Sequence, residues 1–124
     1  RAAAMLYRDH LDRQPLWDDH VRTVLTYQES GEQVLCHRDP TPGNWLCGST
    51  LQLIDWEYAS LGDRWFDLAA LIEGWDWSDA KARLTTQAYV DAAGTTRGIE
   101  QLPAARAAYR ALVSLWVAAS PVIA

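Results

Sequence analysis

Three short apolar runs and a loop rich in proline and glycine interrupt a chain whose other segments have helical character. The runs cover residues 34–36, 45–47 and 51–54, and the loop covers residues 39–44. Short apolar runs bounded by turn residues are typical of strands. Gly48, Ser49 and Thr50 separate the second and third runs, which predicts a β-hairpin. The chain is therefore expected to be mainly α-helical, with one small β-hairpin element.

Helices are expected on both sides of this element. The alanine-rich residues 2–13 favour one helix. A second helix is expected to end near residues 29–31, and its apolar side chains at helical spacing are Trp17, Val21, Val24 and Leu25. Asp63 is the expected N-cap of a helix that runs through residue 72 and buries Trp65, Phe66, Ala69 and Ala70. Ser78 is the expected N-cap of a further helix that runs to about residue 93, with Gly94 just beyond its end. The last helix starts near Pro103, with a predicted apolar face of Ala105, Tyr109, Leu112, Val113, Trp116 and Val117.

Length and charge restrict the class of protein. A chain of 124 residues fits a single domain, expected over residues 1–124. The net charge of −5 and the single lysine, Lys81, argue against a nucleic-acid partner, which needs clustered basic side chains. Two cysteines are too few for a disulfide framework, and the sequence has neither a signal peptide nor an apolar run of about 18 residues. We therefore expect a reduced, cytoplasmic protein with no membrane partner.

The hairpin is expected to bring three oxygen-bearing side chains together. Asn44 enters its first strand and Asp55 leaves its second, so both should lie at the open end. Asp39 lies five residues before Asn44, on a loop stiffened by two prolines. Such oxygen ligands suit Mg²⁺, which binds one or two carboxylates together with substrate phosphates, as phosphoryl transfer requires. The other interpretation is that all three are ordinary turn residues.

The same residues follow the spacing of the kinase catalytic loop, in which H-R-D precedes four residues and Asn. The loop here reads HRDPTPGN from His37 to Asn44. HRDPTPGNWL resembles the catalytic loop of the aminoglycoside phosphotransferase and choline kinase superfamily. IDWEYAS and GDRWFDLA resemble its metal-binding segment and the helix that follows, and are most similar to choline, ethanolamine and thiamine kinase-like members.

This resemblance implies the helical C-terminal lobe of a protein-kinase-like fold, with the catalytic loop and metal segment in residues 34–67. It implies an ATP-dependent phosphotransferase in which Asp39 is the catalytic base and Asn44 and Asp55 bind Mg²⁺. Glu57 is a further candidate for the metal or the substrate. His37 and Asp63 are expected to brace the loop, Asp63 in addition to capping its helix.

The sequence argues against a protein kinase, and it departs from the superfamily in lacking the features of the nucleotide-binding lobe. The seven residues between Asp55 and Asp63 leave no room for the activation segment of a protein kinase, and Trp56 and Glu57 replace its Phe-Gly. No glycine-rich loop follows a strand, and Lys81 lies at a helix start, so the lobe that would grip the nucleotide is expected to be absent. The chain alone is then expected to be a poor kinase. The alternative is a catalytically incompetent kinase-like fragment that serves as a binding or interaction module.

Aromatic and acidic residues follow the candidate metal segment. Trp56, Tyr58, Trp75 and Trp77 are candidates for contact with the substrate, and residues 55–79 hold seven acidic side chains against one basic side chain, Arg64. Aromatic faces bind quaternary ammonium groups, so the substrate predicted is a small cationic alcohol of the choline, thiamine or aminoglycoside type. The other interpretation is a solvated acidic face over an aromatic core.

Two further residue sets have competing interpretations. Arg38 can form a structural salt bridge or bind phosphate. Cys36, His37 and Cys47 offer three soft ligands for zinc, but neighbouring strand residues point to opposite faces, which makes a shared site unfavourable.

Overall fold

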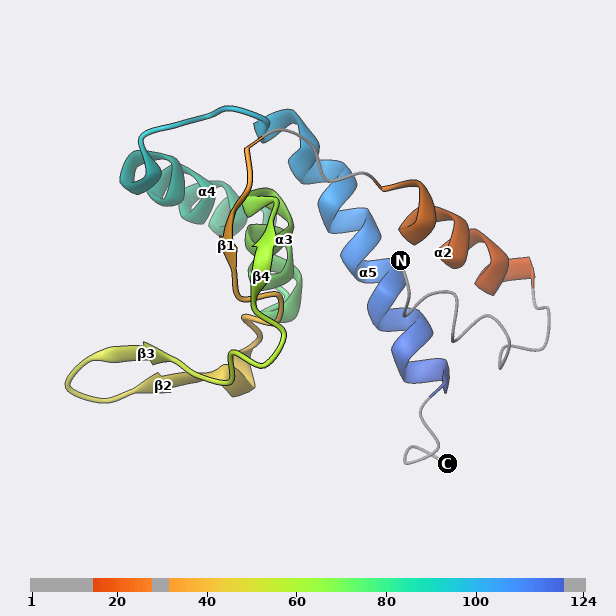
Figure 1. Ribbon diagram of the computed structural model, residues 1–124, viewed down its shortest axis with the longest axis horizontal. Coiled ribbons are helices and arrows are strands. Elements are labelled where there is room, and N and C mark those ends of the chain that lie inside the picture. Colours follow the sequence, from red (N-terminus) through yellow and green to blue (C-terminus); the bar gives the residue numbers. More distant parts are fainter. Residues whose placement is uncertain (1–14, 28–31, 120–124) are drawn as a thin grey trace. The chain divides into compact units, whose positions relative to one another are not determined.

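The computed structural model describes residues 15–27 and 32–119, and these form four α-helices and two small antiparallel sheets (Figure 1). The elements in chain order are α2 (Pro15–Thr26), β1 (Val34–Cys36), η1 (Pro42–Asn44), β2 (Trp45–Cys47), β3 (Leu51–Leu53), β4 (Ser60–Gly62), α3 (Arg64–Gly74), α4 (Asp79–Ala93), η2 (Ile99–Gln101) and α5 (Leu102–Ala119). The prediction of a mainly helical chain with a small β element is confirmed. The helix expected over residues 2–13, and the end expected near 29–31, lie outside the described residues.

The predicted hairpin is present, and a second sheet accompanies it. β2 pairs with β3 in an antiparallel register that sets Trp45 opposite Leu53, while Ile54 lies just beyond the strand. β1 pairs with β4, with Cys36 opposite Ser60. β4 was not predicted, because Ser60–Gly62 contains one large apolar residue and becomes a strand only by pairing with β1.

Capping residues define the ends of the helices after this β region. The Asp63 carboxylate accepts the N–H of Trp65 at 3.0 Å at the start of α3, and Ser78 Oγ accepts the N–H of Lys81 at 3.2 Å at the start of α4. Gly94 ends α4 in the left-handed conformation, with a φ of 70°. The predicted start of α3 and both predicted ends of α4 are therefore confirmed, and α3 runs two residues past the predicted end.

Contacts divide the chain into two compact units. One contains α2 and α5 from Ala107 onward, and its core joins Val21 and Val24 to Ala111 and Leu115. The other extends to Arg106 and contains all four strands, α3, α4 and η2. The expectation of one domain over residues 1–124 stays a prediction. No helix among the described residues is long and apolar enough to cross a bilayer.

The core of the second unit surrounds Trp65, which is 2% exposed and packs with Leu68, Ile72 and Ala82. Its indole N–H donates to the Arg97 carbonyl at 2.9 Å. Gly98 follows with a φ of 81°, and a Cβ there would lie 3.0 Å from Trp65 Nε1. Figure 1 shows β1 and β4 running alongside α3, and the β2–β3 hairpin extending away from them.

The predicted apolar face of α5 is partly wrong. Ala105 and Tyr109 are buried as expected, but Val113, Trp116 and Val117 are exposed. Ala108, Ala111 and Leu115, which were not part of the predicted face, are buried as well. Small alanines allow close approach of a neighbouring helix, so the buried side of α5 is not the side with the largest apolar residues.

Candidate active site

The loop after β1 holds Asp39 and Asn44 against each other. The Asn44 side-chain N–H₂ group donates to the Asp39 backbone carbonyl at 2.8 Å and to its carboxylate at 3.2 Å. The N–H of Thr41 also donates to the Asp39 carbonyl at 2.8 Å, which closes the turn before η1. Because the Asn44 nitrogen faces Asp39, its amide oxygen is the atom left to bind another group.

The peptide groups of Ile54 tie this loop to the segment that contains Asp55. The Ile54 N–H donates to the Asn44 carbonyl at 2.8 Å, and the Ile54 carbonyl lies 2.8 Å from Nε2 of His37. His37 Nδ1 accepts the N–H of Asp39 at 3.1 Å, so the ring carries its proton on Nε2 and donates it to Ile54. The His37 side chain, 2% exposed, thus lies between the two segments and acts through hydrogen bonds on both.

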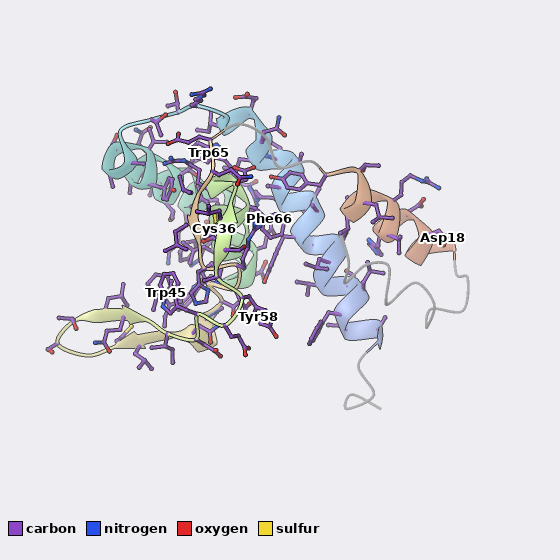
Figure 2. All side chains as sticks on the ribbon, in the orientation of Figure 1. Asp18, Cys36, Trp45, Tyr58, Trp65 and Phe66 are labelled. Carbon is purple, nitrogen blue, oxygen red and sulfur yellow. The ribbon has the colours of Figure 1, made fainter. Side chains whose placement is uncertain are left out.

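Asp55 follows Ile54 directly and is exposed, in the left-handed conformation with a φ of 65°. Aspartate tolerates this conformation better than most residues. The charge of Glu57 is the main cause that raises the pKa of the Tyr58 hydroxyl, and the charges of Asp39 and Asp55 raise it further. Asp39, Asp55 and Glu57 therefore lie within electrostatic reach of one tyrosine. Figure 2 places Tyr58 near the junction of the hairpin with the rest of this unit.

Asp67 clamps the start of the loop, a role that the sequence did not predict. Its two carboxylate oxygens accept the backbone N–H groups of His37 at 2.7 Å and of Arg38 at 2.8 Å. Burial raises the pKa of the Asp67 carboxyl, although these two hydrogen bonds oppose the shift. Asp67 lies in the first turn of α3, four residues after the capping Asp63.

Asp63, also expected to brace the loop, is 3% exposed and caps α3 through the N–H of Trp65. The brace from α3 to the loop backbone is made by Asp67, four residues later. A direct bracing contact from Asp63 stays a prediction.

The four candidate aromatic residues lie in two pairs rather than one cluster. Trp56 meets His37 edge-on, with ring centroids 4.7 Å apart, and lies near Tyr58 in sequence. Trp75 and Trp77 stack with centroids 5.9 Å apart, and the Lys81 ammonium lies 4.9 Å from the Trp77 centroid. Within the described part of the chain, no ring contact joins one pair to the other.

The second pair follows directly after a residue that packs against the loop in space. A Cβ on Gly74 would lie 3.2 Å from Thr41 Cγ2, so the end of α3 packs directly on the loop, and Trp75 follows at once. Gly74 was not singled out from the sequence, because this close approach is a tertiary contact.

The donor set fits a hard divalent cation that also binds phosphate. The Asp55 carboxylate and the Asn44 amide oxygen would leave coordination positions for phosphate and water, as Mg²⁺ prefers. Among the described residues, no group of three or more His, Cys, Asp or Glu side chains could hold a metal ion by itself. Of the proposed zinc ligands, Cys36 is buried and Cys47 is exposed.

Helices around the short loop of residues 37–44, a hairpin that leads into Asp55 and a carboxylate from the next helix that binds the loop backbone match the helical lobe of a kinase-like fold. The chain belongs to the phosphotransferase enzyme family, whose sequence profile matches residues 1–112.

Solved structures with the same fold include LicA in complex with AMP, with a TM-score of 0.71 and 20% identity over 95% of this chain and 44% of that one. The choline kinase LicA from Streptococcus pneumoniae gives a TM-score of 0.70 and 19% identity over 95% of this chain and 45% of that one. The chain thus spans less than half the length of these kinases. No curated protein matches it.

Proposed function

We propose that this chain carries the catalytic base and the metal-holding residues of an ATP-dependent phosphotransferase that acts on the hydroxyl of a small cationic molecule. The supporting observation is the pair of hydrogen bonds at Ile54, which ties the loop with Asp39 and Asn44 to the segment with Asp55. Phosphoryl transfer depends mainly on positioning and charge stabilisation, and this arrangement supplies both.

Each residue has a distinct task in this proposal. Asp39 accepts a hydrogen bond from the substrate hydroxyl, orients it towards the phosphorus and takes its proton late in the transfer. Asn44, through its free amide oxygen, and Asp55, through its exposed carboxylate, hold Mg²⁺. When bound, Mg²⁺ neutralises charge on the nucleotide phosphates.

The aromatic and acidic residues support a cationic substrate of the choline or thiamine type. Trp75 is 40% exposed, whereas Lys81 already occupies a face of Trp77. Trp56 and Tyr58 are exposed beside Asp55, and Glu57 adds negative charge there. A quaternary or protonated amine would gain both cation–π and charge interactions from these side chains.

The nucleotide grip is proposed to come from a lobe outside this sequence, in a cytoplasmic protein. The solved kinases with this fold are more than twice as long as the part that aligns, and one of them contains AMP. Lys81, the only lysine here, lies in the first turn of α4 beside the Trp77 ring, and not on a strand.

The test is phosphotransfer by the full-length natural protein with ATP, Mg²⁺ and a panel of amino alcohols that starts with choline and thiamine. Asp39→Asn removes the proton acceptor at nearly constant volume and should lower kcat by roughly 10²–10⁴-fold with an unchanged unfolding midpoint. Asp91→Asn, on the exposed face of α4, is the matched control and should keep full activity. A folded wild-type protein with no turnover on any acceptor would favour the binding-module alternative, and full activity of Asp39→Asn would refute the assignment.

A further inference from the structure

Arg38 is held at both of its ends. Its backbone N–H donates to Asp67 at 2.8 Å, and its guanidinium donates from Nε to Ser60 Oγ at 3.0 Å and from Nη2 to the Leu61 carbonyl at 3.1 Å. The guanidinium carbon also lies 6.0 Å from the centre of the Phe66 ring. The side chain therefore reaches from the catalytic loop to β4 and across the first turn of α3.

The backbone of Arg38 is strained. Its φ of 79° lies in the left-handed region, which glycine adopts freely and arginine does not. Such a conformation is unfavourable and persists only where surrounding contacts hold it. Glycine would fit this position without strain but would lack the side-chain hydrogen bonds to Ser60 and Leu61.

The contacts of Arg38 join the two segments that contain the candidate carboxylates. β1 and β4 pair with Cys36 opposite Ser60, so the segment towards Asp39 leaves this sheet at the same end where the segment from Asp55 enters it. The Asp55 segment is short, and its turn is closed by the Ala59 N–H, which donates to the Trp56 carbonyl at 3.0 Å. Fixing Ser60 and Leu61 therefore limits how far Asp55 can move from Asp39.

We propose that Arg38 is a positioning residue that sets the separation between Asp39 and Asp55 by linking the catalytic loop to β4, an inference that rests on the proposed function. In this proposal Arg38 acts through its hydrogen bonds to the Ser60 hydroxyl and the Leu61 carbonyl. The planar guanidinium is suited to this because one fork can donate to a hydroxyl and a carbonyl at once.

The first experiment compares Arg38→Gly, Arg38→Lys and Ser60→Ala with Ser49→Ala, an exposed serine at the hairpin tip that serves as the control. Arg38→Gly removes the link and the backbone strain together, so we expect little change in the urea midpoint of unfolding. We expect amide exchange at Ala59 to become about tenfold faster, because restraint of the turn is lost. Ser60→Ala and Arg38→Lys, which each keep one donor–acceptor pair, should have intermediate effects.

The second measurement is the Mg²⁺ concentration that gives half-maximal phosphotransfer. Loss of a residue that orients metal ligands typically weakens metal binding by about 10–100-fold, and we expect Arg38→Gly to raise this concentration by about tenfold. A purely structural role would lower the unfolding midpoint and leave the Mg²⁺ requirement unchanged.

The exchange measurement separates this inference from the proposed function. Unchanged exchange at Ala59 in both Arg38→Gly and Ser60→Ala would overturn the inference, even if Asp39→Asn is inactive as proposed. Faster exchange in a protein that transfers no phosphate would support the link through Arg38 and refute the proposed function alone.

Discussion

At the scale of single residues, the candidate site depends on peptide groups as much as on side chains. Ile54 has an unremarkable side chain, yet its N–H and carbonyl bind Asn44 and His37 respectively. An exchange of the Ile54 side chain for another apolar one would keep both hydrogen bonds. Asp67 also binds peptide groups of the loop, but it does so through its own carboxylate, which accepts the backbone N–H groups of His37 and Arg38.

Asp67 should give the site a measurable pH dependence. Burial raises its pKa in the folded protein, so between the usual aspartate pKa and this raised value the folded state binds more protons than the unfolded state. The free energy of unfolding should therefore fall as pH rises through this window, and the fall should be absent in Asp67→Asn. Urea unfolding of both proteins at several pH values measures the difference.

A direct titration checks the sign. The ¹³C carboxyl signal of Asp67 should have its midpoint above that of the same residue in the urea-unfolded chain. A midpoint below the unfolded value would mean that the N–H groups of His37 and Arg38 outweigh burial.

Residue types and spacing predicted Asp39, Asn44 and Asp55 as a group because a hairpin is a local structure. They did not predict the partner of the loop, since Asp67 lies 30 residues from His37 along the chain and the contact depends on how α3 packs. The helix pattern indicates only that Asp67 is in a first turn. The positive φ values of Arg38 and Asp55 were likewise not predicted from residue type and spacing.

At the scale of elements, the helix caps were the most predictable features, and the pairing of β1 with β4 was the least predictable. Ser78 and Gly94 mark the two ends of α4. A serine side chain and a left-handed glycine each allow the unpaired backbone N–H or carbonyl groups at a helix end to find a nearby partner. β4 has no such local signal. Its partner β1 lies well over 20 residues away in sequence, so only the folded chain identifies it.

The turn before α5 should be sensitive to a single methyl group. Gly98→Ala would place a side chain at a φ of 81° and a Cβ 3.0 Å from Trp65 Nε1. We expect a loss of about 1–3 kcal/mol in the free energy of unfolding, from the strained backbone and the displaced indole. Thermal or urea unfolding measures it, with Gly94→Ala as a comparison that has the same type of φ but no atom within 4 Å of the added Cβ. Equal losses in the two variants would mean that backbone strain alone is responsible.

At the scale of the whole molecule, the residues that the structure describes form two separate cores. Val21, Val24, Ala111 and Leu115 form one, and Trp65, Leu68, Ile72 and Ala82 form the other, with no residue in common. The hydrophobic pattern predicted which segments are amphipathic. It did not predict which faces meet, and the alanine-lined side of α5 shows why, since small residues give a weak pattern and close packing.

Matched cavities should test whether the cores are independent. Leu115→Ala and Ile72→Ala each remove a fully buried side chain and should cost about 2–5 kcal/mol. If the units open separately, Leu115→Ala speeds amide exchange mainly in α2 and late α5, and Ile72→Ala mainly in α3 and α4. Uniform acceleration in both variants would indicate a single cooperative unit.

The unequal exposure of the two thiols gives a practical route to the hairpin. Cys36 is 1% exposed, whereas Cys47 lies exposed on β2, three residues from Asn44. A thiol-reactive spin label should therefore attach at Cys47 in the native sequence, without engineered substitutions. The mobility of that label would report directly on whether nucleotide or metal immobilises the strand beside the loop.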